Sequence, residues 1–244
     1  MKKINNIFLK KKILIYGLGK SGISTYNFLR EKAEIYLFDD NLINNFRFKN
    51  KSLSFSKILK SNFDFIIISP GIDFSKCRLS KYLKQNYSKI YTDLDVFYSF
   101  FNNDSVTITG TNGKSTTAQI VYEVLRQEKI DVRIVGNIGN PILSEKNITN
   151  ETVFVIEASS YQLDYSKIFR ANIAVILNIT PDHLERHGNF NNYAQAKFKL
   201  IKNQEKRTFS FVDLNSPYIN KFIKKNRLNS KIIKIKKNSI KTKL

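Results

Sequence analysis

The sequence is poor in cysteine and in long apolar runs, and both shortages narrow what the protein can be. The single cysteine, Cys77, excludes an internal disulfide and a zinc site built from cysteines. No stretch approaches the roughly eighteen apolar residues of a membrane span, and the run ILIYG at residues 13–17 is too short for a signal-peptide core. We therefore expect a soluble, cytoplasmic protein with no membrane partner.

Acidic residues are also scarce, because 20 Asp and Glu stand against 41 Lys and Arg, which gives a net charge of +21. Such a balance often marks proteins that bind nucleic acid, anionic lipid or acidic substrates. Here lysines lie in almost every segment, beside many asparagines and isoleucines, so the excess is a bias of the whole chain. We expect no nucleic-acid partner.

Short β-like runs alternate with helical patterns along the chain, which predicts parallel sheets wrapped by helices, an α/β fold. We place one domain at residues 1–99 and a second at 100–244, joined by the segment FFNNDS at 100–105. The expected strands of the first domain are KILIYG, EIYLFDD, FDFIIISPG and KIYTDLD, with a helix from about Ser21 to Lys32. Those of the second are SVTIT, VRIVG, TVFVIEA, IAVILNI and RTFSFVD, with a helix from Lys114 to about Glu128 and KIIKIKK as an exposed edge strand.

The first glycine motif, G-x-G-x-x-G at Gly17, Gly19 and Gly22, follows a strand and precedes a helix. Asp39 ends the next strand, so the arrangement is that of a dinucleotide-binding, Rossmann-like domain. The same turn can bind any nucleotide diphosphate or sugar phosphate, or can serve only the packing of helix on strand. A nicotinamide-dependent dehydrogenase is therefore one open interpretation.

A second glycine loop, TGTNGKSTT, follows the strand at 105–109 and opens a helix at Lys114. It is two residues shorter than the usual phosphate loop, but strand, glycine loop, Lys114, Ser115 and helix follow in the order that phosphate and magnesium binding require. The sequence therefore predicts a P-loop-type α/β domain in the second half of the chain.

Four further stretches carry residues of interest, three of them near expected strand ends and one on an expected helix. Glu157 lies at the tip of a buried-looking strand, where with a phosphate loop upstream a magnesium role is favoured. Both histidines of the chain, His183 and His187, lie in LNITPDHLERHG, which alone would indicate a helix cap with polar surface groups. Lys197 and Lys199 lie on an amphipathic helix, and Gly71 lies in the turn SPGI.

Together, GLGKSG, SPGI, TGTNGKSTT, GNIG, EASSYQLD, NITPDHLERHG and YAQAK occur in the order and spacing of the Mur ligase family, which the chain resembles over nearly its whole length. The glycine loops look most like those of the D-glutamate-adding members. The resemblance implies an ATP-dependent amide-bond-forming ligase of cytoplasmic peptidoglycan precursor synthesis. In such a ligase ATP phosphorylates the alanine carboxylate of UDP-N-acetylmuramoyl-L-alanine, and the amine of D-glutamate attacks the acyl phosphate.

The resemblance also implies roles for residues at matching positions. The ATP phosphates would be held by Gly110, Thr111, Asn112, Gly113, Lys114, Ser115 and Thr116. Up to two Mg²⁺ ions would be held by Ser115, Glu157, His183 and Lys197, the lysine being carbamylated by CO₂ into an anionic ligand. The catalytic set would be Lys114, Glu157, His183 and Lys197. The UDP-sugar would contact Lys20, Ser21, Asp39, Asp40, Gly71, Asn137, Ser159 and Gln162.

The chain departs from the family at Leu244, because a third domain that closes over the site is expected in Mur ligases and has no counterpart here. By resemblance the second domain, 100–244, is expected to be truncated. We expect the isolated chain to bind UDP-sugar and nucleotide and to have little or no ligase turnover, with the remainder either lost or encoded separately. A non-catalytic UDP-sugar-binding fragment, another Mur ligase and a dehydrogenase are the alternatives to a D-glutamate-adding ligase.

Overall fold

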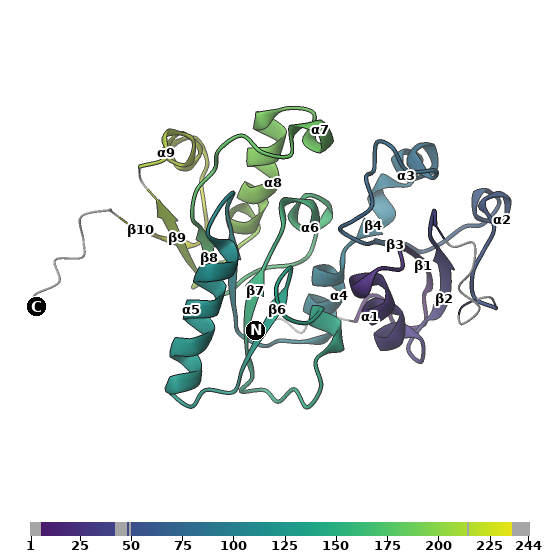
Figure 1. Ribbon diagram of the computed structural model, residues 1–244, viewed down its shortest axis with the longest axis horizontal. Helices are drawn as coiled ribbons and strands as arrows, with labels where there is room; N and C mark the ends of the chain where they lie inside the picture. The colour runs from purple at the N-terminus through teal and green to yellow at the C-terminus, as the bar shows by residue number, and fades with distance from the viewer. Residues whose placement is uncertain (1–5, 42–47, 49, 214, 236–244) are drawn as a thin grey trace, which may run out of the picture. The chain divides into compact units, whose positions relative to one another are not determined.

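The computed structural model describes residues 6–41, 48, 50–213 and 215–235 (Figure 1). The chain divides into two compact units. The first unit holds Met1–Asn102 together with two short later segments, Pro141–Lys146 and Tyr165–Phe169. The second holds Asn103–Asn140, Asn147–Asp164 and Arg170–Leu244. The chain therefore returns to the first unit twice after leaving it.

The first unit is built on a four-stranded parallel sheet in the order β2-β1-β3-β4. Ile- and Leu-rich runs form its strands, because apolar residues on both faces suit a sheet that helices cover on both sides. The elements are β1 Lys12–Tyr16, α1 Lys20–Leu29, β2 Glu34–Phe38, α2 Phe55–Leu59, β3 Phe65–Ile68, α3 Ser80–Gln85, the 3₁₀ turn Tyr87–Lys89, β4 Ile90–Tyr91 and α4 Asp93–Phe100. The 3₁₀ turn Ile142–Ser144 also belongs to this unit.

In the turn between β1 and α1, the structure requires glycine at two of the three positions, for a different reason at each. Gly17 adopts φ +94°, in the left-handed region that favours glycine. A Cβ at Gly22 would lie 1.8 Å from the Gly17 carbonyl oxygen, so this position holds α1 close to β1. Neither constraint applies to Gly19, because its φ is −71° and a Cβ there would meet no atom within 4 Å. The turn therefore leaves open space at the start of α1.

Replacing Gly22 by alanine should destabilise the protein by about 1–3 kcal/mol, because the new methyl group collides with backbone that cannot move without shifting β1. Gly19→Ala is the matched control and should cost less than about 1 kcal/mol, because its methyl group has room. Urea unfolding followed by circular dichroism suits this chain, which has no tryptophan. Equal losses in the two variants would contradict the assignment of Gly22 to packing.

A buried carboxylate, Asp95, fastens a later segment of the chain to the first unit. Its Oδ2 accepts hydrogen bonds from the backbone N–H and the hydroxyl of Thr92 at 2.9 and 3.2 Å, and closes the capping box of α4. Its Oδ1 accepts from the Ser166 hydroxyl at 2.8 Å and from the backbone N–H groups of residues 167–169 at 2.8–3.0 Å. One side chain thus holds the returning segment by four hydrogen bonds.

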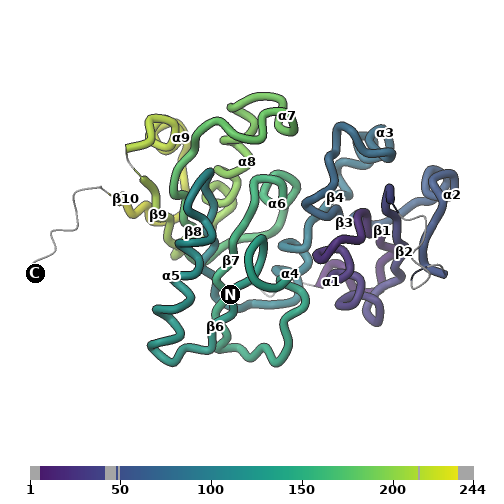
Figure 2. Tube along the Cα trace, in the orientation of Figure 1, coloured from purple at the N-terminus to yellow at the C-terminus, as the bar shows by residue number. Residues whose placement is uncertain are grey.

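The second unit is built on a six-stranded sheet in the order β10-β9-β8-β5-β7-β6, with every neighbouring pair parallel. Its elements are β5 Ser105–Thr109, α5 Lys114–Gln127, β6 Val132–Gly136, β7 Val153–Glu157, α6 Ser160–Tyr165, β8 Ile173–Ile176, α7 Leu184–His187, α8 Phe190–Lys202, β9 Phe209–Asp213, α9 Pro217–Lys225 and β10 Lys231–Ile235. The last residue of α6, Tyr165, belongs to the first unit. Figure 2 follows the chain from β9 through α9 to β10, the last described element.

The predicted fold class is confirmed: the protein has a Rossmann-like parallel-sheet part followed by a P-loop-type α/β part. One predicted strand is wrong in extent. KIYTDLD contributes only Ile90 and Tyr91 to the sheet, because the Thr92–Asp95 capping box starts α4 at Asp93. KIIKIKK forms β10 at the edge of the second sheet, as predicted, over its described residues Lys231–Ile235.

Candidate functional site

The phosphate loop lies between β5 and α5, at the carboxyl edge of the parallel sheet. Gly113 adopts φ +82° and caps α5, which turns the chain from strand to helix within four residues. The first turn of α5 carries no acidic side chain, so its free N–H groups and positive dipole end are available to an anion. Lys114 is the first residue of the helix, and its Nζ donates to the Thr111 carbonyl at 2.8 Å.

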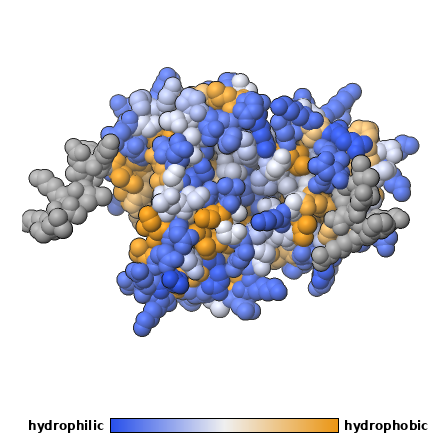
Figure 3. Space-filling view, in the orientation of Figure 1, coloured by the Kyte–Doolittle hydropathy of each residue, from blue (hydrophilic) through white to orange (hydrophobic). Residues whose placement is uncertain are grey.

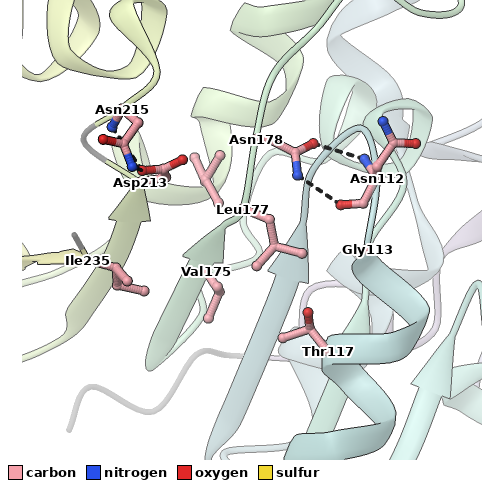
Figure 4. A pocket seen from close by; sticks show the side chains of 10 residues that line it. Asn112, Gly113, Thr117, Val175, Leu177, Asn178, Asp213, Asn215 and Ile235 are labelled. Atoms are coloured by element: carbon pink, nitrogen blue, oxygen red, sulfur yellow. Dashed lines mark hydrogen bonds between the residues drawn. The ribbon is translucent and has the colours of Figure 1, made fainter. Parts of the chain in front are cut away.

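Asn178, which the sequence reasoning missed, fixes the shape of this loop. Its Oδ1 accepts from the backbone N–H of Thr111 at 3.1 Å. Its Oδ1 also accepts from the backbone N–H of Asn112 at 2.9 Å, and its Nδ2 donates to the Asn112 carbonyl at 3.0 Å (Figure 4). The Thr111 hydroxyl in turn lies 3.1 Å from the Thr180 carbonyl oxygen and 3.0 Å from the Tyr193 hydroxyl. An asparagine just after a strand gives no sequence signal that it will pair with a loop 66 residues earlier.

Glu157, at the end of β7, meets two other predicted site residues. Its Oε2 accepts from the Ser115 hydroxyl at 2.7 Å, and its Oε1 accepts from the Asn137 side-chain amide at 3.0 Å. Gly136 permits this approach, because a Cβ there would lie 2.3 Å from the Glu157 carbonyl oxygen. Glu157 is only 1% exposed. The structure therefore gathers Ser115, Asn137 and Glu157 at the start of α5.

Lys197, on α8, contacts the first residue of the phosphate loop through its ammonium group. Its Nζ donates to the Gly110 carbonyl at 2.8 Å and lies 4.6 Å from the centre of the Tyr193 ring. The side chain is 2% exposed. Burial, assisted by the nearby Lys114 charge, lowers the pKa of Lys197 to about 7, while Asp182 acts in the opposite direction.

His183 lies at the surface in the left-handed region, with φ +51°. Its backbone N–H donates to the Asp182 carboxylate at 2.9 Å, and its ring nitrogens lie 3.5 Å from Asp182 and 3.9 Å from Glu185. Within the part of the chain that the structure describes, no group of three or more His, Cys, Asp or Glu side chains could hold a metal ion. The metal-ligand roles of His183 and Lys197 therefore stay predictions, and Ser115 and Glu157 are the expected ligands that the structure brings into contact.

The other histidine, His187, was named with His183 in the sequence, where the simple interpretation was a polar surface group; this is wrong for His187, which is buried. Its Nε2 lies 3.0 Å from the Ser160 hydroxyl, and its ring stacks on that of Tyr161 at 5.3 Å. Burial lowers the pKa of His187, so its neutral form is favoured. Ser159 and Gln162, both predicted to meet the substrate, bond to each other through backbone and side chain at 3.2–3.3 Å.

In the first unit, Asp39 and Asp40 line a pocket of about 250 Å³ together with Phe38, Ser52, Leu53, Ser54, Phe55 and Arg78. Asp39 accepts from the Leu18 backbone N–H at 2.6 Å, which ties it to the glycine turn. Asp40 Oδ2 accepts from the Tyr16 hydroxyl at 2.7 Å, and burial followed by this bond raises the pKa of Tyr16. Among the described residues, Asp40 Oδ1 is buried without a hydrogen-bond partner.

The remaining predicted residues of the first unit lie at exposed or half-exposed positions. Lys20 and Ser21 are the first two residues of α1, beside the open space at Gly19. Gly71 is exposed in the loop after β3, and a Cβ there would meet no atom within 4 Å. These positions are free for a ligand, but within the described ranges no hydrogen bond or ion pair joins them to Asp39 or Asp40.

A second pocket, of about 560 Å³, adjoins the phosphate loop in the second unit (Figure 4). Asn112 and Gly113 of the loop and Thr117 of α5 form one side. The other side is formed by residues at or beyond the ends of three strands: Val175, Ile176, Leu177, Asn178, Asp213, Asn215 and Ile235. The pocket and the loop form one continuous surface, large enough for the nucleoside part of a nucleotide.

A glycine loop at a helix start, with a lysine, a hydroxyl and a buried carboxylate beside it, is an arrangement typical of phosphate-binding α/β proteins. Residues 108–244 match the family profile described as Mur ligase middle domain, which is more than half of the chain. The chain belongs to the Mur ligase family. No helix among the described residues is both long and apolar enough to cross a membrane.

Curated relatives of the chain are named UDP-N-acetylmuramoylalanine–D-glutamate ligase. The protein of that name from Rickettsia bellii is 38% identical over 218 residues, covering 87% of this chain and 48% of the relative. The one from Rickettsia felis is 36% identical over 219 residues, with shares of 87% and 48%. The chain thus spans about half the length of the curated relatives it matches.

Among solved structures, a UDP-N-acetylmuramate:L-alanyl-gamma-D-glutamyl-meso-diaminopimelate ligase from Neisseria meningitides is similar in fold. It has a TM-score of 0.57 and 14% identity, covering 92% of this chain and 77% of that one. At this identity the similarity concerns the fold alone.

Proposed function

We propose that the chain carries the UDP-sugar-binding and ATP-binding parts of a ligase that adds D-glutamate to UDP-N-acetylmuramoyl-L-alanine. The names of relatives at 36–38% identity support the reaction. The observation that carries the proposal is the contact of Ser115 with Glu157 at the start of α5, beside a glycine loop that opens a helix with no acidic residue in its first turn. The setting of such a ligase is the cytoplasmic synthesis of peptidoglycan precursors.

The residues at the phosphate loop fit ATP with Mg²⁺. The N–H groups of residues 110–116 and the Lys114 ammonium would offset the negative charge of the phosphates. Ser115 and Glu157 supply hydroxyl and carboxylate oxygens 2.7 Å apart, the ligand type that Mg²⁺ prefers. Bound magnesium would neutralise charge that develops as the terminal phosphoryl group passes to the alanine carboxylate. Asn137 would keep Glu157 in place for this role.

The lowered pKa of Lys197 suits the formation of a carbamate. Only a neutral amine can attack CO₂, and a pKa of about 7 leaves a substantial neutral fraction at neutral pH. The neutral amine would add to CO₂ with loss of one proton, and the resulting carbamate would offer anionic oxygen ligands. His183, at the surface on the loop after β8, is the residue we propose for a second metal ion.

The first unit fits a nucleotide diphosphate sugar. The unpartnered Asp40 Oδ1 faces no donor in the described part of the chain and could accept from an imide N–H or a ribose hydroxyl. Gly19 and Lys20 lie at the start of α1, a ten-residue helix whose N–H groups can bind a phosphate. Ser159 and Gln162 are proposed to meet the muramoyl-alanine part, with Asn137.

Calorimetric titration with UDP-N-acetylmuramoyl-L-alanine tests this proposal. We expect saturable binding, weakened about tenfold or more in Asp39→Ala, because that variant loses the acceptor that holds the glycine turn at Leu18. NADH is the control ligand and should not bind. Binding of NADH without binding of the UDP-sugar would overturn the ligase assignment and favour a dehydrogenase.

A further inference from the structure

The imidazole ring of His187, the last residue of α7, contacts both α6 and α8. Its Nε2 is 3.0 Å from the hydroxyl of Ser160, the first residue of α6, and both residues are buried. The ring stacks on that of Tyr161 at 5.3 Å, and it meets the ring of Tyr193 in a T-shaped contact at 5.4 Å. One buried side chain therefore links the start of α6 to the first turn of α8.

Tyr193 extends this link to the phosphate loop. Its hydroxyl lies 3.0 Å from the hydroxyl of Thr111, and Tyr193 is only 1% exposed. The backbone N–H of Thr180 donates to the same Thr111 hydroxyl at 3.0 Å, so the contact has a fixed partner on the loop side. A chain of side-chain contacts thus runs from α6 through His187 and Tyr193 to a loop that we propose to hold the ATP phosphates.

The other end of this chain of contacts is a turn that we propose to meet the UDP-sugar. We call residues 159–162 the substrate turn. Ser159 and Gln162 bond to each other at 3.2–3.3 Å, and Ser160 lies between them in sequence. Ser159 is half-exposed and Ser160 is buried, so a ligand can reach the first while His187 holds the second. A ligand that fixes the substrate turn therefore also fixes the hydroxyl that His187 contacts.

The backbone around His187 is anchored to the same helix. The His187 carbonyl accepts from the side-chain amide of Asn192 at 2.9 Å, and the backbone N–H of Asn192 donates to the capping side chain of Asn189 at 2.9 Å. The face of the molecule drawn in Figure 3 is mainly hydrophilic, and such a surface suits a histidine, yet His187 is only 8% exposed. Its place is set by contacts inside the protein.

We propose that His187 is a positioning residue that couples the substrate turn to the phosphate loop. It contacts the Ser160 hydroxyl and the Tyr193 ring together, so a substrate that orders the turn also orders the loop that receives the nucleotide. Two sites are coupled through an element whose arrangement both of them bias, and His187 is that element here. The inference rests on the proposed function, because the ligands of the two segments are taken from it.

A second contact between the same two regions supplies a matched control. The Thr109 hydroxyl donates to the Ala158 carbonyl at 2.9 Å, between the ends of the neighbouring strands β5 and β7. Thr109 directly precedes the phosphate loop, and Ala158 directly precedes the substrate turn. Thr109→Val removes this buried hydrogen bond, keeps the branched shape of the side chain and leaves the contacts of His187 in place.

Hydrogen exchange in the phosphate loop tests the coupling. Exchange at residues 110–116 is compared with and without saturating UDP-N-acetylmuramoyl-L-alanine, in the native chain and in each variant. The ligand should slow exchange at least fivefold in the native chain and less than twofold in His187→Phe, which keeps an aromatic ring and loses Nε2. Ser160→Ala removes the same contact from the other side and should give the same loss, and the double variant should lose no more.

Thr109→Val should keep the native response to the ligand. Undiminished slowing in His187→Phe and Ser160→Ala would overturn the inference, and so would a native chain that binds the UDP-sugar without slowing of the loop. An equal loss in Thr109→Val would also overturn it, because the effect would then come from packing in general. If His187→Phe does not fold, Ser160→Ala decides alone. Titration of the native chain separates the two proposals: a chain that does not bind the UDP-sugar contradicts the proposed function and this inference with it.

Discussion

Replacing Asp95 by alanine should lower the free energy of unfolding of the first unit by about 3–5 kcal/mol. The carboxylate is 0% exposed and accepts six hydrogen bonds from Thr92, Ser166 and the backbone of residues 167–169. Alanine accepts none of them, so several buried N–H and O–H groups would lose their partner. A buried donor without a partner costs its full desolvation free energy.

Asp95→Asn should cost less than Asp95→Ala, because the amide keeps one oxygen for the donors of residues 166–169 and places an N–H₂ group against Thr92. Asp64→Ala is the matched control, since Asp64 is an exposed carboxylate that accepts one backbone hydrogen bond from Lys12. Unfolding by urea measures the loss of overall stability, and hydrogen exchange at the amides of residues 167–169 measures the loss of local stability in the returning segment. Native protection of those amides in Asp95→Ala would contradict the inference that Asp95 holds residues 166–169 in place.

Asp95 also illustrates what the sequence could not predict about the fold. Apolar runs such as KILIYG and SVTIT predicted the strands well, because strand formation depends on the run itself. The return of residues 165–169 to the first unit depends on one carboxylate more than 70 residues earlier. An acidic residue near a helix start looks like an ordinary cap, and Asp95 is one, so its second set of partners leaves no local pattern.

The candidate site likewise contains residues that the sequence predicted and residues that it could not predict. Ser115 and Glu157 were predicted from motifs at strand ends and Asn137 from the family resemblance, and they meet because the carboxyl ends of parallel strands share one edge of the sheet. Asn178 and Tyr193, which shape the phosphate loop, were missed, since their partners become neighbours only when β8 and α8 pack beside β5. The burial of Lys197 was likewise invisible, because a lysine on an amphipathic helix is normally solvated.

Replacing Lys197 by methionine should change how stability depends on pH. The pKa of about 7 in the folded protein lies below the ordinary value of 10.5, so between these values the unfolded chain binds a proton that the folded chain lacks. The stability of the native protein therefore rises with pH across this window, by up to about 1.4 kcal/mol per pH unit, and the gain is lost as pH falls to 7. Methionine, similar in length and uncharged, removes this dependence.

The measurement compares unfolding free energies of the two proteins between about pH 7.5 and 9.5 in CO₂-free buffer, so that no carbamate forms. The free energy of unfolding of Lys197→Met, taken relative to that of the native protein, should decrease by roughly 1.4 kcal/mol per pH unit as pH rises. Loss of the hydrogen bond to Gly110 adds an offset independent of pH, so the slope isolates the titration of the lysine. Lys202→Met removes an exposed lysine from the same helix and reports the effect of net charge alone. A pH-independent difference between Lys197→Met and the native protein would mean that Lys197 stays charged when buried, and CO₂ would then find no neutral amine to attack at neutral pH.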